Sequence, residues 1–257
     1  MFRVRRLLAP FVLCIALLFS EAQAFTIAWL SDTQNYHNAY KPIFDGMTQW
    51  IADNRAALDI RFVFHTGDVV GRWSSEDQWR QARESMGILS NASIPFLVAC
   101  GNHDIGYRMN YANFLKYVLS LRPASMSQEY GDTGSRYELF SANGRDYIFM
   151  GIAFSNKGPS EDEVNWINGV LRQYSSRDAI IITHSYLKKS ASYTTQGKAI
   201  FEKIVKANPN VFLVLCGHCR DISYKNVQLD DDGDGDPDRT VYAILSNFQG
   251  SKAGGGG

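Results

Sequence analysis

Apolar, β-rich runs recur along this chain, and each leads directly into polar, chemically reactive residues. Near-continuous runs of Val, Ile, Leu and Phe are typical of central strands that are covered on both faces of a sheet. The five runs, with the residues that follow them, are FTIAWL before Ser31–Gln34, IRFVFHT before Gly67–Asp68, IPFLVAC before Gly101–Asp104, DAIIIT before His184, and VFLVLC before Gly217–His218. The pattern requires helices or a second sheet on both sides of these strands.

Segments with helical spacing lie between the runs. Apolar residues repeat at three and four positions in four segments, 44–51, 79–89, 164–171 and 200–205. Residues 136–154 are expected to form a hairpin with Asn143–Gly144 as its turn, because Asn-Gly favours the left-handed backbone of a two-residue hairpin loop. Alternation of strands and helices, followed by hairpins, predicts a layered α/β domain with mixed sheets.

The residues after the strands have the chemistry of a metal site. Asp32, Asp68, Asn102, His184 and His218 provide hard oxygen atoms and imidazoles, which divalent metals prefer. Ligands of such folds gather beyond the carboxyl ends of the strands, where these residues lie. A single polar residue at a strand end is more often structural, since its side chain forms hydrogen bonds with the neighbouring backbone. Five together favour a metal site.

The order of these motifs resembles the calcineurin-like metallophosphoesterases. The sequence reads D-T-Q from Asp32, then G-D, then G-N-H-D, then a strand-end His and finally G-H. It is most similar to a secreted branch whose first motif is D-T-Q, and the likeness covers nearly all of residues 25–257. The resemblance implies a four-layer α-β-β-α sandwich with two mixed β-sheets. It also implies metal-dependent hydrolysis of phosphate mono- or diesters in a phosphorylated small molecule or macromolecule.

The family resemblance also implies roles for individual residues. Asp68 would bridge two divalent ions (Mn, Fe or Zn), and Asp32 would belong to the first ion. His103 would protonate the leaving group, with Asp104 orienting its imidazole. The ligands implied for the second ion are Asn102, His184 and His218.

Two departures weaken the first metal position. Gln34 stands where the family commonly has His, and Arg220 replaces the last His of G-H-x-H. A neutral amide oxygen is a weaker ligand, and a guanidinium stays protonated and cannot ligate a cation. We therefore expect one tightly held ion, or two of unequal affinity, with Arg220 clamping phosphate oxygens. The alternative is a catalytically weakened binding protein on the same fold.

Residues 1–24 are expected to form a cleaved export signal. Arg3, Arg5 and Arg6 precede an apolar run, and Ala22-Gln23-Ala24 is a small-residue cleavage signal. We therefore expect a periplasmic or secreted protein without a membrane anchor after cleavage; a retained N-terminal anchor is the alternative. The chain carries 26 basic and 26 acidic side chains, and no Lys/Arg cluster in the sequence suggests a nucleic-acid surface.

Residues 25–257 are expected to form one domain, because no linker or repeat divides them. The chain stops at SNFQGSKAGGGG, where the resembling family usually continues into another strand, so a truncated C-terminal end is expected. The segment DDDGDGDPD at Asp230–Asp238 has the opening of a calcium loop. Val241 stands where the bidentate carboxylate would be, so an acidic turn and weak calcium binding both remain open.

The spacing of Cys216 and Cys219 allows a rival function. Cys-Gly-His-Cys matches a redox motif of thiol-disulfide oxidoreductases, but those enzymes place the first Cys at the start of a helix. No helix signal follows Cys219. With Cys100, three cysteines remain after the export signal, which leaves one bridge or three free thiols open. His65 is expected to be a core histidine or one that supports the site.

Overall fold

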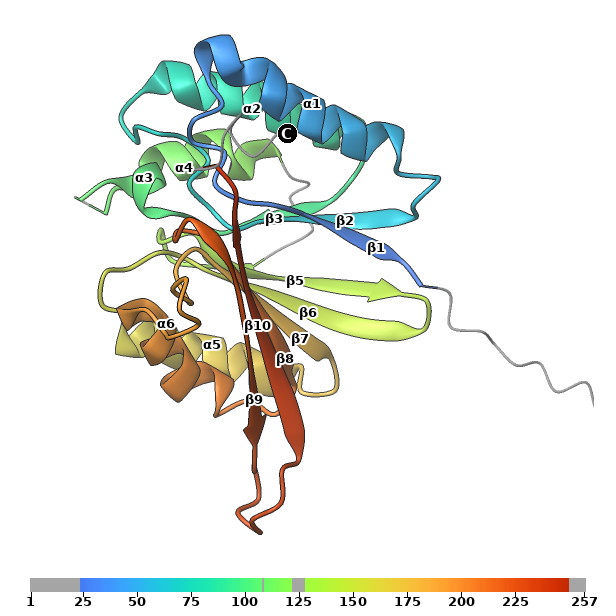
Figure 1. Cartoon of the computed structure of the whole chain (residues 1–257), viewed down its shortest axis with the longest axis vertical. Helices are drawn as coiled ribbons and strands as arrows, with labels where there is room; N and C mark the ends of the chain where they lie inside the picture. Colours follow the sequence, from blue (N-terminus) through green and yellow to red (C-terminus); the bar gives the residue numbers. More distant parts are fainter. Residues whose placement is uncertain (1–23, 108, 122–127, 250–257) are drawn as a thin grey trace, which may run out of the picture.

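In the computed structural model, two β-sheets pack face to face between two layers of helices (Figure 1). The structure describes residues 24–107, 109–121 and 128–249. The expected export signal at 1–24 and the glycines at 254–257 thus lie almost wholly outside the described residues. Among the described residues, no helix is long and apolar enough to cross a bilayer.

The smaller sheet has the order β1-β2-β3 and contains only parallel pairs in the described part of the chain. Its strands are β1 (Thr26–Leu30), β2 (Ile60–His65) and β3 (Phe96–Val98). The elements between and after them are η1 (Asn38–Tyr40), α1 (Lys41–Asp53), α2 (Glu76–Asn91), α3 (Asn102–Ile105), α4 (Ala112–Tyr117) and η2 (Leu119–Leu121). Helices α1 and α2 cover the outer face of this sheet (Figure 1).

The larger sheet has the order β4-β5-β6-β7-β8-β10-β9 and mixes parallel with antiparallel pairs. Its strands are β4 (Gln128–Tyr130), β5 (Ser135–Ala142), β6 (Arg145–Ile152), β7 (Asp178–Thr183), β8 (Val211–Cys216), β9 (Asp221–Leu229) and β10 (Arg239–Asn247). Its outer face is covered by α5 (Glu161–Gln173), α6 (Thr195–Ile200) and the π-helical turn η3 (Phe201–Val205).

Alternation along the central strands builds three apolar layers. In β2, Phe62 and Phe64 point into the space between the sheets, whereas Val63 packs under the helices. Phe149 of β6 meets both phenylalanines from the other sheet, with ring centroids 4.8 Å apart. The predicted four-layer sandwich is therefore confirmed, and the near-continuous apolar runs are strands buried on both faces.

The expected hairpin is also confirmed. Strands β5 and β6 pair antiparallel, and Asn143 (φ 52°) and Gly144 (φ 76°) form the turn with left-handed backbone. Strand β6 then pairs in parallel with β7, and β7 with β8. The carboxyl ends of these three strands therefore point to the same edge.

Main-chain hydrogen bonds join the loops at the carboxyl ends of both sheets. The amide of Asp32 donates to the carbonyl of Gly67 (3.2 Å), and Phe154 after β6 donates to Cys100 after β3 (3.0 Å). The second bond crosses from one sheet to the other. The polar strand ends singled out in the sequence thus meet at one edge of the sandwich.

Candidate metal centre

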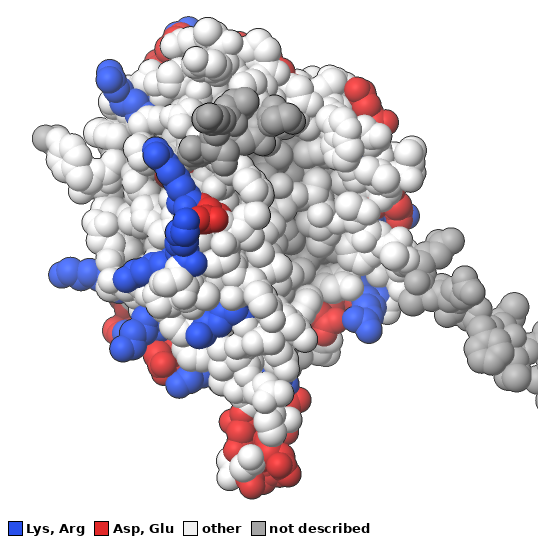
Figure 2. Space-filling view, in the orientation of Figure 1, with Lys and Arg blue, Asp and Glu red and all other residues white. Residues whose placement is uncertain are grey.

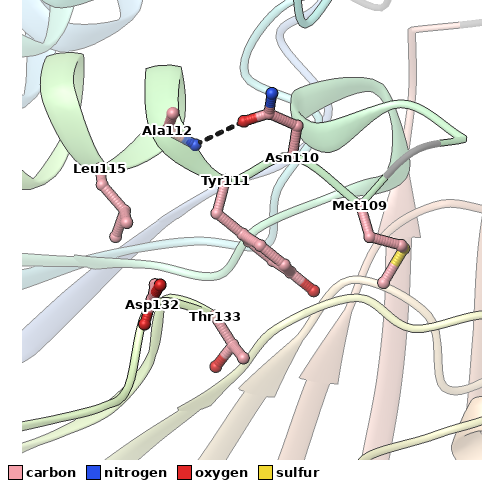
Figure 3. A pocket seen from close by; sticks show the side chains of 7 residues that line it. All are labelled: Met109, Asn110, Tyr111, Ala112, Leu115, Asp132 and Thr133. Atoms are coloured by element: carbon pink, nitrogen blue, oxygen red, sulfur yellow. Dashed lines mark hydrogen bonds between the residues drawn. The ribbon is translucent and has the colours of Figure 1, made fainter.

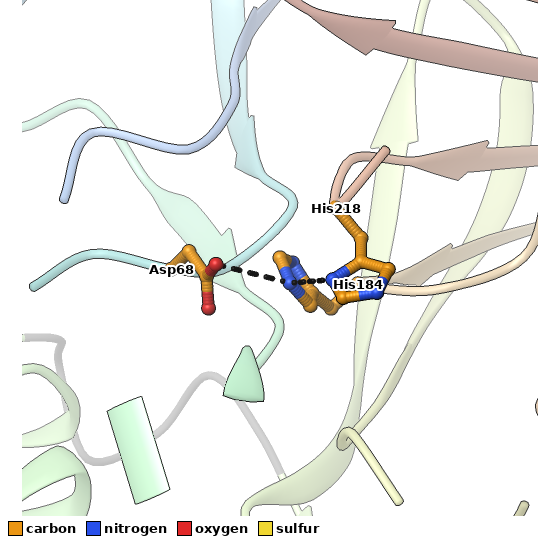
Figure 4. Close-up of side chains that lie close together, drawn as sticks. All are labelled: Asp68, His184 and His218. Atoms are coloured by element: carbon orange, nitrogen blue, oxygen red, sulfur yellow. Dashed lines mark hydrogen bonds and ion pairs between the residues drawn. The ribbon is translucent and has the colours of Figure 1, made fainter. Parts of the chain in front are cut away.

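Four side chains from four different segments converge on one point. His184 Nε2 lies 3.0 Å from Asn102 Oδ1, 3.1 Å from His218 Nδ1 and 3.3 Å from Asp68 Oδ2. Figure 4 shows three of these side chains turned toward one another. Ligand atoms that share one divalent ion at about 2.1 Å lie roughly 3.0 to 3.5 Å apart. The separations therefore fit the ligand shell of one metal ion.

Main-chain groups set the orientation of these ligands. His184 Nδ1 lies 2.9 Å from the carbonyl oxygen of Thr66, so it donates there and turns Nε2 to the site. The amide of His103 donates to Asp68 Oδ1 (2.8 Å), which leaves Oδ2 toward His184. Such outer hydrogen bonds fix the ring tautomer and the ligand direction.

The loops that carry the ligands have tight backbone turns. Asp32, Asp68 and His218 have φ values of 50°, 52° and 69°, in the left-handed region that non-glycine residues seldom adopt. Strain of this kind persists only where surrounding contacts hold it, and it gathers at functional sites.

Two glycines let the loops approach closely. A Cβ at Gly101 would lie 2.3 Å from Asp68 Oδ1, and a Cβ at Gly217 would lie 2.1 Å from Asp32 Oδ2. Neither position has room for a side chain. The glycines of G-N-H-D and G-H are therefore required by the contact between neighbouring loops.

Buried negative charge gives a second reason for a cation here. Asp32, Asp68 and Asp104 are each at most 2% exposed, and none pairs with Lys or Arg in the described part of the chain. Burial raises the pKa of Asp32 to about 6. Burial alone would lower the pKa of His184, but Asp68 raises it to about 9. Three buried carboxylates with one histidine as their basic partner fit a site that binds a divalent ion.

Gln34 and Asp32, which the sequence places at the first metal position, have partners within the protein. Gln34 Nε2 donates to Asp68 Oδ2 (3.1 Å), and its buried Oε1 has no partner. Both carboxylate oxygens of Asp32 accept from the amide of His218 at 3.2 Å. This position therefore offers one free amide oxygen and a carboxylate that already holds the loop of His218.

The expected pairing of Asp104 with the His103 imidazole is wrong. His103 Nδ1 lies 2.9 Å from the carbonyl oxygen of Gly71, which accepts its proton. Asp104 is the third residue of the short helix α3, and its carboxylate turns back into the protein. It accepts from the amides of Gly101 (2.8 Å), Val69 (2.8 Å) and Val70 (3.1 Å). Asp104 thus joins the loop of Gly101 to the loop of Val69 and Val70.

His65 supports the first motif. Gly67 donates its amide to His65 Nδ1 (3.1 Å), so Nε2 carries the proton and donates to Thr33 Oγ1 (3.1 Å). The Thr33 hydroxyl in turn donates to the Val69 carbonyl (3.2 Å). Burial lowers the pKa of His65 to about 3, so the ring is neutral. The sequence predicted that His65 is a core or supporting histidine. It contains no signal for this chain of hydrogen bonds, or for the carbonyls of Gly71 and Thr66 that hold His103 and His184.

Arg220 is exposed and lies two residues after His218, ahead of β9. Among the residues the structure describes, it makes no ion pair with Asp32 or Asp68. The side chain is therefore free to meet a ligand from solvent, and its expected contact with the first position is not seen.

The cysteines lack the setting of a redox pair. Cys100, Cys216 and Cys219 are free, and Cys216 ends β8 with no helix after it. Burial raises the pKa of Cys216 to about 12. A thiol with such a pKa is not a nucleophile at neutral pH.

Three carboxylates also approach one another in the β9–β10 turn. Oxygen atoms of Asp230, Asp232 and Asp238 lie within 4.8 Å of each other, and all three residues are exposed. This arrangement leaves both the acidic turn and weak calcium binding open.

A cavity of about 710 Å³ lies beside α4 (Figure 3). Its wall combines apolar and polar groups, from Met109, Asn110, Tyr111, Leu115, Asp132 and Thr133. The hydroxyl of Tyr111 donates to the Phe154 carbonyl (3.3 Å). The ring of Phe154 lies 5.9 Å from the rings of both His184 and His218. One aromatic residue thus separates the cavity wall from the metal centre.

The chain belongs to the calcineurin-like phosphoesterase family, whose profile matches residues 25–219. This is a family of metal-dependent phosphoesterases. An uncharacterized protein of Bacillus subtilis (strain 168), YvnB, is 41% identical over 237 residues. The match covers 91% of this chain and 18% of YvnB. The chain therefore spans less than a fifth of the length of this relative.

Solved structures of phosphatases share the fold. A dimetal phosphatase from Danio rerio superposes with a TM-score of 0.57 at 14% identity, over 86% of each chain. A purple acid phosphatase from yellow lupin (Lupinus luteus) seeds gives 0.55 at 14% identity, over 93% of this chain and 45% of its own. At this identity the likeness establishes the α/β sandwich with two sheets.

Proposed function

We propose that this protein hydrolyses phosphate mono- or diesters with the help of a divalent ion held by Asp68, Asn102, His184 and His218. One observation carries the proposal: three potential ligand atoms, from Asn102, His218 and Asp68, lie 3.0 to 3.3 Å from a fourth, His184 Nε2. Membership of the calcineurin-like family supports the same reaction. The ion, when bound, polarises the phosphoryl group and lowers the pKa of water.

His103 is the proposed general acid. Its ring is exposed at the edge of the site, and the Gly71 carbonyl holds Nδ1–H. In the imidazolium form, Nε2 keeps a second proton that faces away from Gly71. Transfer of this proton to the leaving oxygen completes the cleavage when water attacks phosphorus.

Arg220 and Gln34 are proposed to replace part of the first metal position. Gln34 Nε2 donates to Asp68 Oδ2, and an amide N–H there offers only partial positive charge. Arg220 has no carboxylate partner among the described residues and is free to hold phosphate oxygens through two N–H groups. We infer one tightly held ion (Mn, Fe or Zn) per chain. We also propose that the protein acts in the periplasm or outside the cell.

Metal-reconstituted protein provides the test. Protein treated with a chelator and then with Mn²⁺, Fe²⁺ or Zn²⁺ should hydrolyse an aryl phosphate monoester or diester, and His184→Ala should not. The alternative, a binding protein on the same fold, would still take up metal and phosphate without any turnover. Absence of hydrolysis with all three metals would favour that alternative.

A further inference from the structure

Basic side chains from separate segments gather on one rim of the metal centre. Figure 2 shows Lys and Arg concentrated on the side that carries α6 and the start of β9, whereas Asp and Glu gather at the β9–β10 turn. Basic residues follow β6 and β7, lie in α6 and flank the start of β9; this group, called the basic rim, comprises Lys157, Lys188, Lys189, Lys198, Arg220 and Lys225. These residues are spread over nearly 70 positions of the sequence, so only the folded chain can bring them together.

Contacts between the loops hold the rim together. The loop of Lys157 packs on α6, where a Cβ at Gly158 would lie 2.6 Å from the Cβ of Ala199. Ser223 of β9 donates its hydroxyl to the carbonyl of Lys188 (2.8 Å), so β9 lies against the loop after β7. Lys225 of the same strand lies over the ring of Tyr193, 5.4 Å from its centroid.

Loops of the basic rim are continuous with segments of the metal centre. Lys157 follows Phe154 by three positions, and the Phe154 ring lies 5.9 Å from the rings of two metal ligands. Lys188 follows His184 by four positions, and its carbonyl accepts from Ser223, five positions after His218. Two loops that start at the metal centre therefore carry lysines of the basic rim.

Most residues of the basic rim have no ion-pair partner among the residues that the structure describes. In the described part of the chain, only Lys189 of the basic rim pairs with a carboxylate, that of Asp221. By contrast, Lys203 and Lys206 on the same side of the fold pair with Glu161 and Glu202. The whole sequence has equal numbers of basic and acidic side chains, 26 of each. A group of unpaired cations beside a metal centre raises the local concentration of anions.

We propose that the basic rim binds a second anionic group, so that the substrate carries at least one phosphate besides the one that reacts. This inference rests on the proposed function and names the substrate class. The metal centre holds the reacting phosphate, and Lys157, Lys188 and Lys198 hold the additional one. Arg220, between the two, can contact either phosphate.

Binding of inorganic phosphates tests the inference without any turnover. Inorganic tripolyphosphate should bind the metal-loaded protein more tightly than orthophosphate in calorimetry. In the triple variant Lys157→Gln, Lys188→Gln, Lys198→Gln, its Kd should rise about tenfold, since three exposed cations are lost and each contributes modestly. Binding of orthophosphate should stay within about twofold. The double variant Lys203→Gln, Lys206→Gln is the matched control, because its lysines already have acidic partners.

Kinetics provide the second arm. Wild-type protein should show a higher kcat/KM for a nucleoside diphosphate than for the matching monophosphate, and the triple variant should lose this preference but keep its activity on p-nitrophenyl phosphate. Long-chain polyphosphate distinguishes a polymeric from a small substrate, because only a polymer site gains affinity with chain length. Equal binding of tripolyphosphate by the wild type and the triple variant would overturn the inference. If the metal-loaded wild type does not hydrolyse p-nitrophenyl phosphate, the proposed function is overturned instead.

Discussion

The imidazole Nδ1 of His103 lies 2.9 Å from the carbonyl oxygen of Gly71. The main chain therefore orients the proposed general acid, and the neighbouring carboxylate of Asp104 has a different task. Asp104 holds three amides from two motif loops. Adjacent residues of one motif thus have separable effects on activity and on stability.

Replacement of these two residues should separate the effects. Asp104→Ala leaves three buried amides without an acceptor, so the free energy of unfolding should fall by at least about 3 kcal/mol. His103→Gln changes an exposed ring, so stability should stay within about 0.5 kcal/mol while hydrolysis falls by about 10² to 10⁴. Urea unfolding and phosphatase assays measure both. A His103 variant with full activity would remove the proposed general acid.

Gly217 should not tolerate a methyl group. A Cβ there would lie 2.1 Å from Asp32 Oδ2 and 2.6 Å from Ser31 Oγ, so Gly217→Ala must displace the loop that carries His218. We expect a loss of about 1 to 3 kcal/mol in unfolding free energy, together with weaker metal binding. Gly169→Ala is the control, since nothing lies within 4 Å of its added Cβ in α5. That change should stabilise the helix by about 0.5 to 1 kcal/mol, and equal effects of the two variants would contradict the account.

Much of the fold follows from local patterns in the sequence. The runs before Asp68 and His218 are apolar on both faces, and Asn143–Gly144 marks the hairpin turn. Strands with these properties can be placed without knowledge of their partners. Ligand types at strand ends then indicate which edge carries the site.

The remaining features depend on contacts between distant segments. The carbonyls of Gly71 and Thr66 orient His103 and His184, yet every residue has a carbonyl, so no residue type marks them. The carboxylate of Asp104 has several amides within reach, and only the folded loops decide between them and His103. The basic rim likewise consists of separate lysines such as Lys157 and Lys198, which meet only when the β6–α5 loop packs on α6.

The thiols should be dispensable for hydrolysis. Burial raises the pKa of Cys219, and that of Cys216 to about 12, so neither is a thiolate at neutral pH. Cys219→Ser should therefore leave phosphatase activity nearly unchanged, whereas His218→Ala should abolish it. Insulin reduction by the wild type that disappears in Cys216→Ser would support the thiol-disulfide reading instead.

Glu163 should make stability depend on pH. It is buried where it accepts from the Ser135 hydroxyl, and burial raises its pKa. Because the folded state holds this proton more tightly, the contribution of Glu163 is fully present below the pKa of the unfolded chain. It is lost as pH rises through the raised value. Glu163→Gln should thus be more stable relative to wild type at pH 8 than at pH 4.5 in urea unfolding. No difference between the two pH values would show that Glu163 ionises in the protein as it does in water.

Metal analysis after dialysis tests the central claim most directly. Protein loaded with excess Mn²⁺, Fe²⁺ or Zn²⁺ and dialysed should retain about one ion per chain. The proposed ligands Asp68, Asn102, His184 and His218 form one set, whereas Gln34 and Arg220 are expected to weaken the other position. Arg220→His should raise this number toward two, and His184→Ala should lower it toward zero. Two equally tight ions in the unmodified protein would contradict the one-ion site, and no retained ion would contradict the metal centre itself.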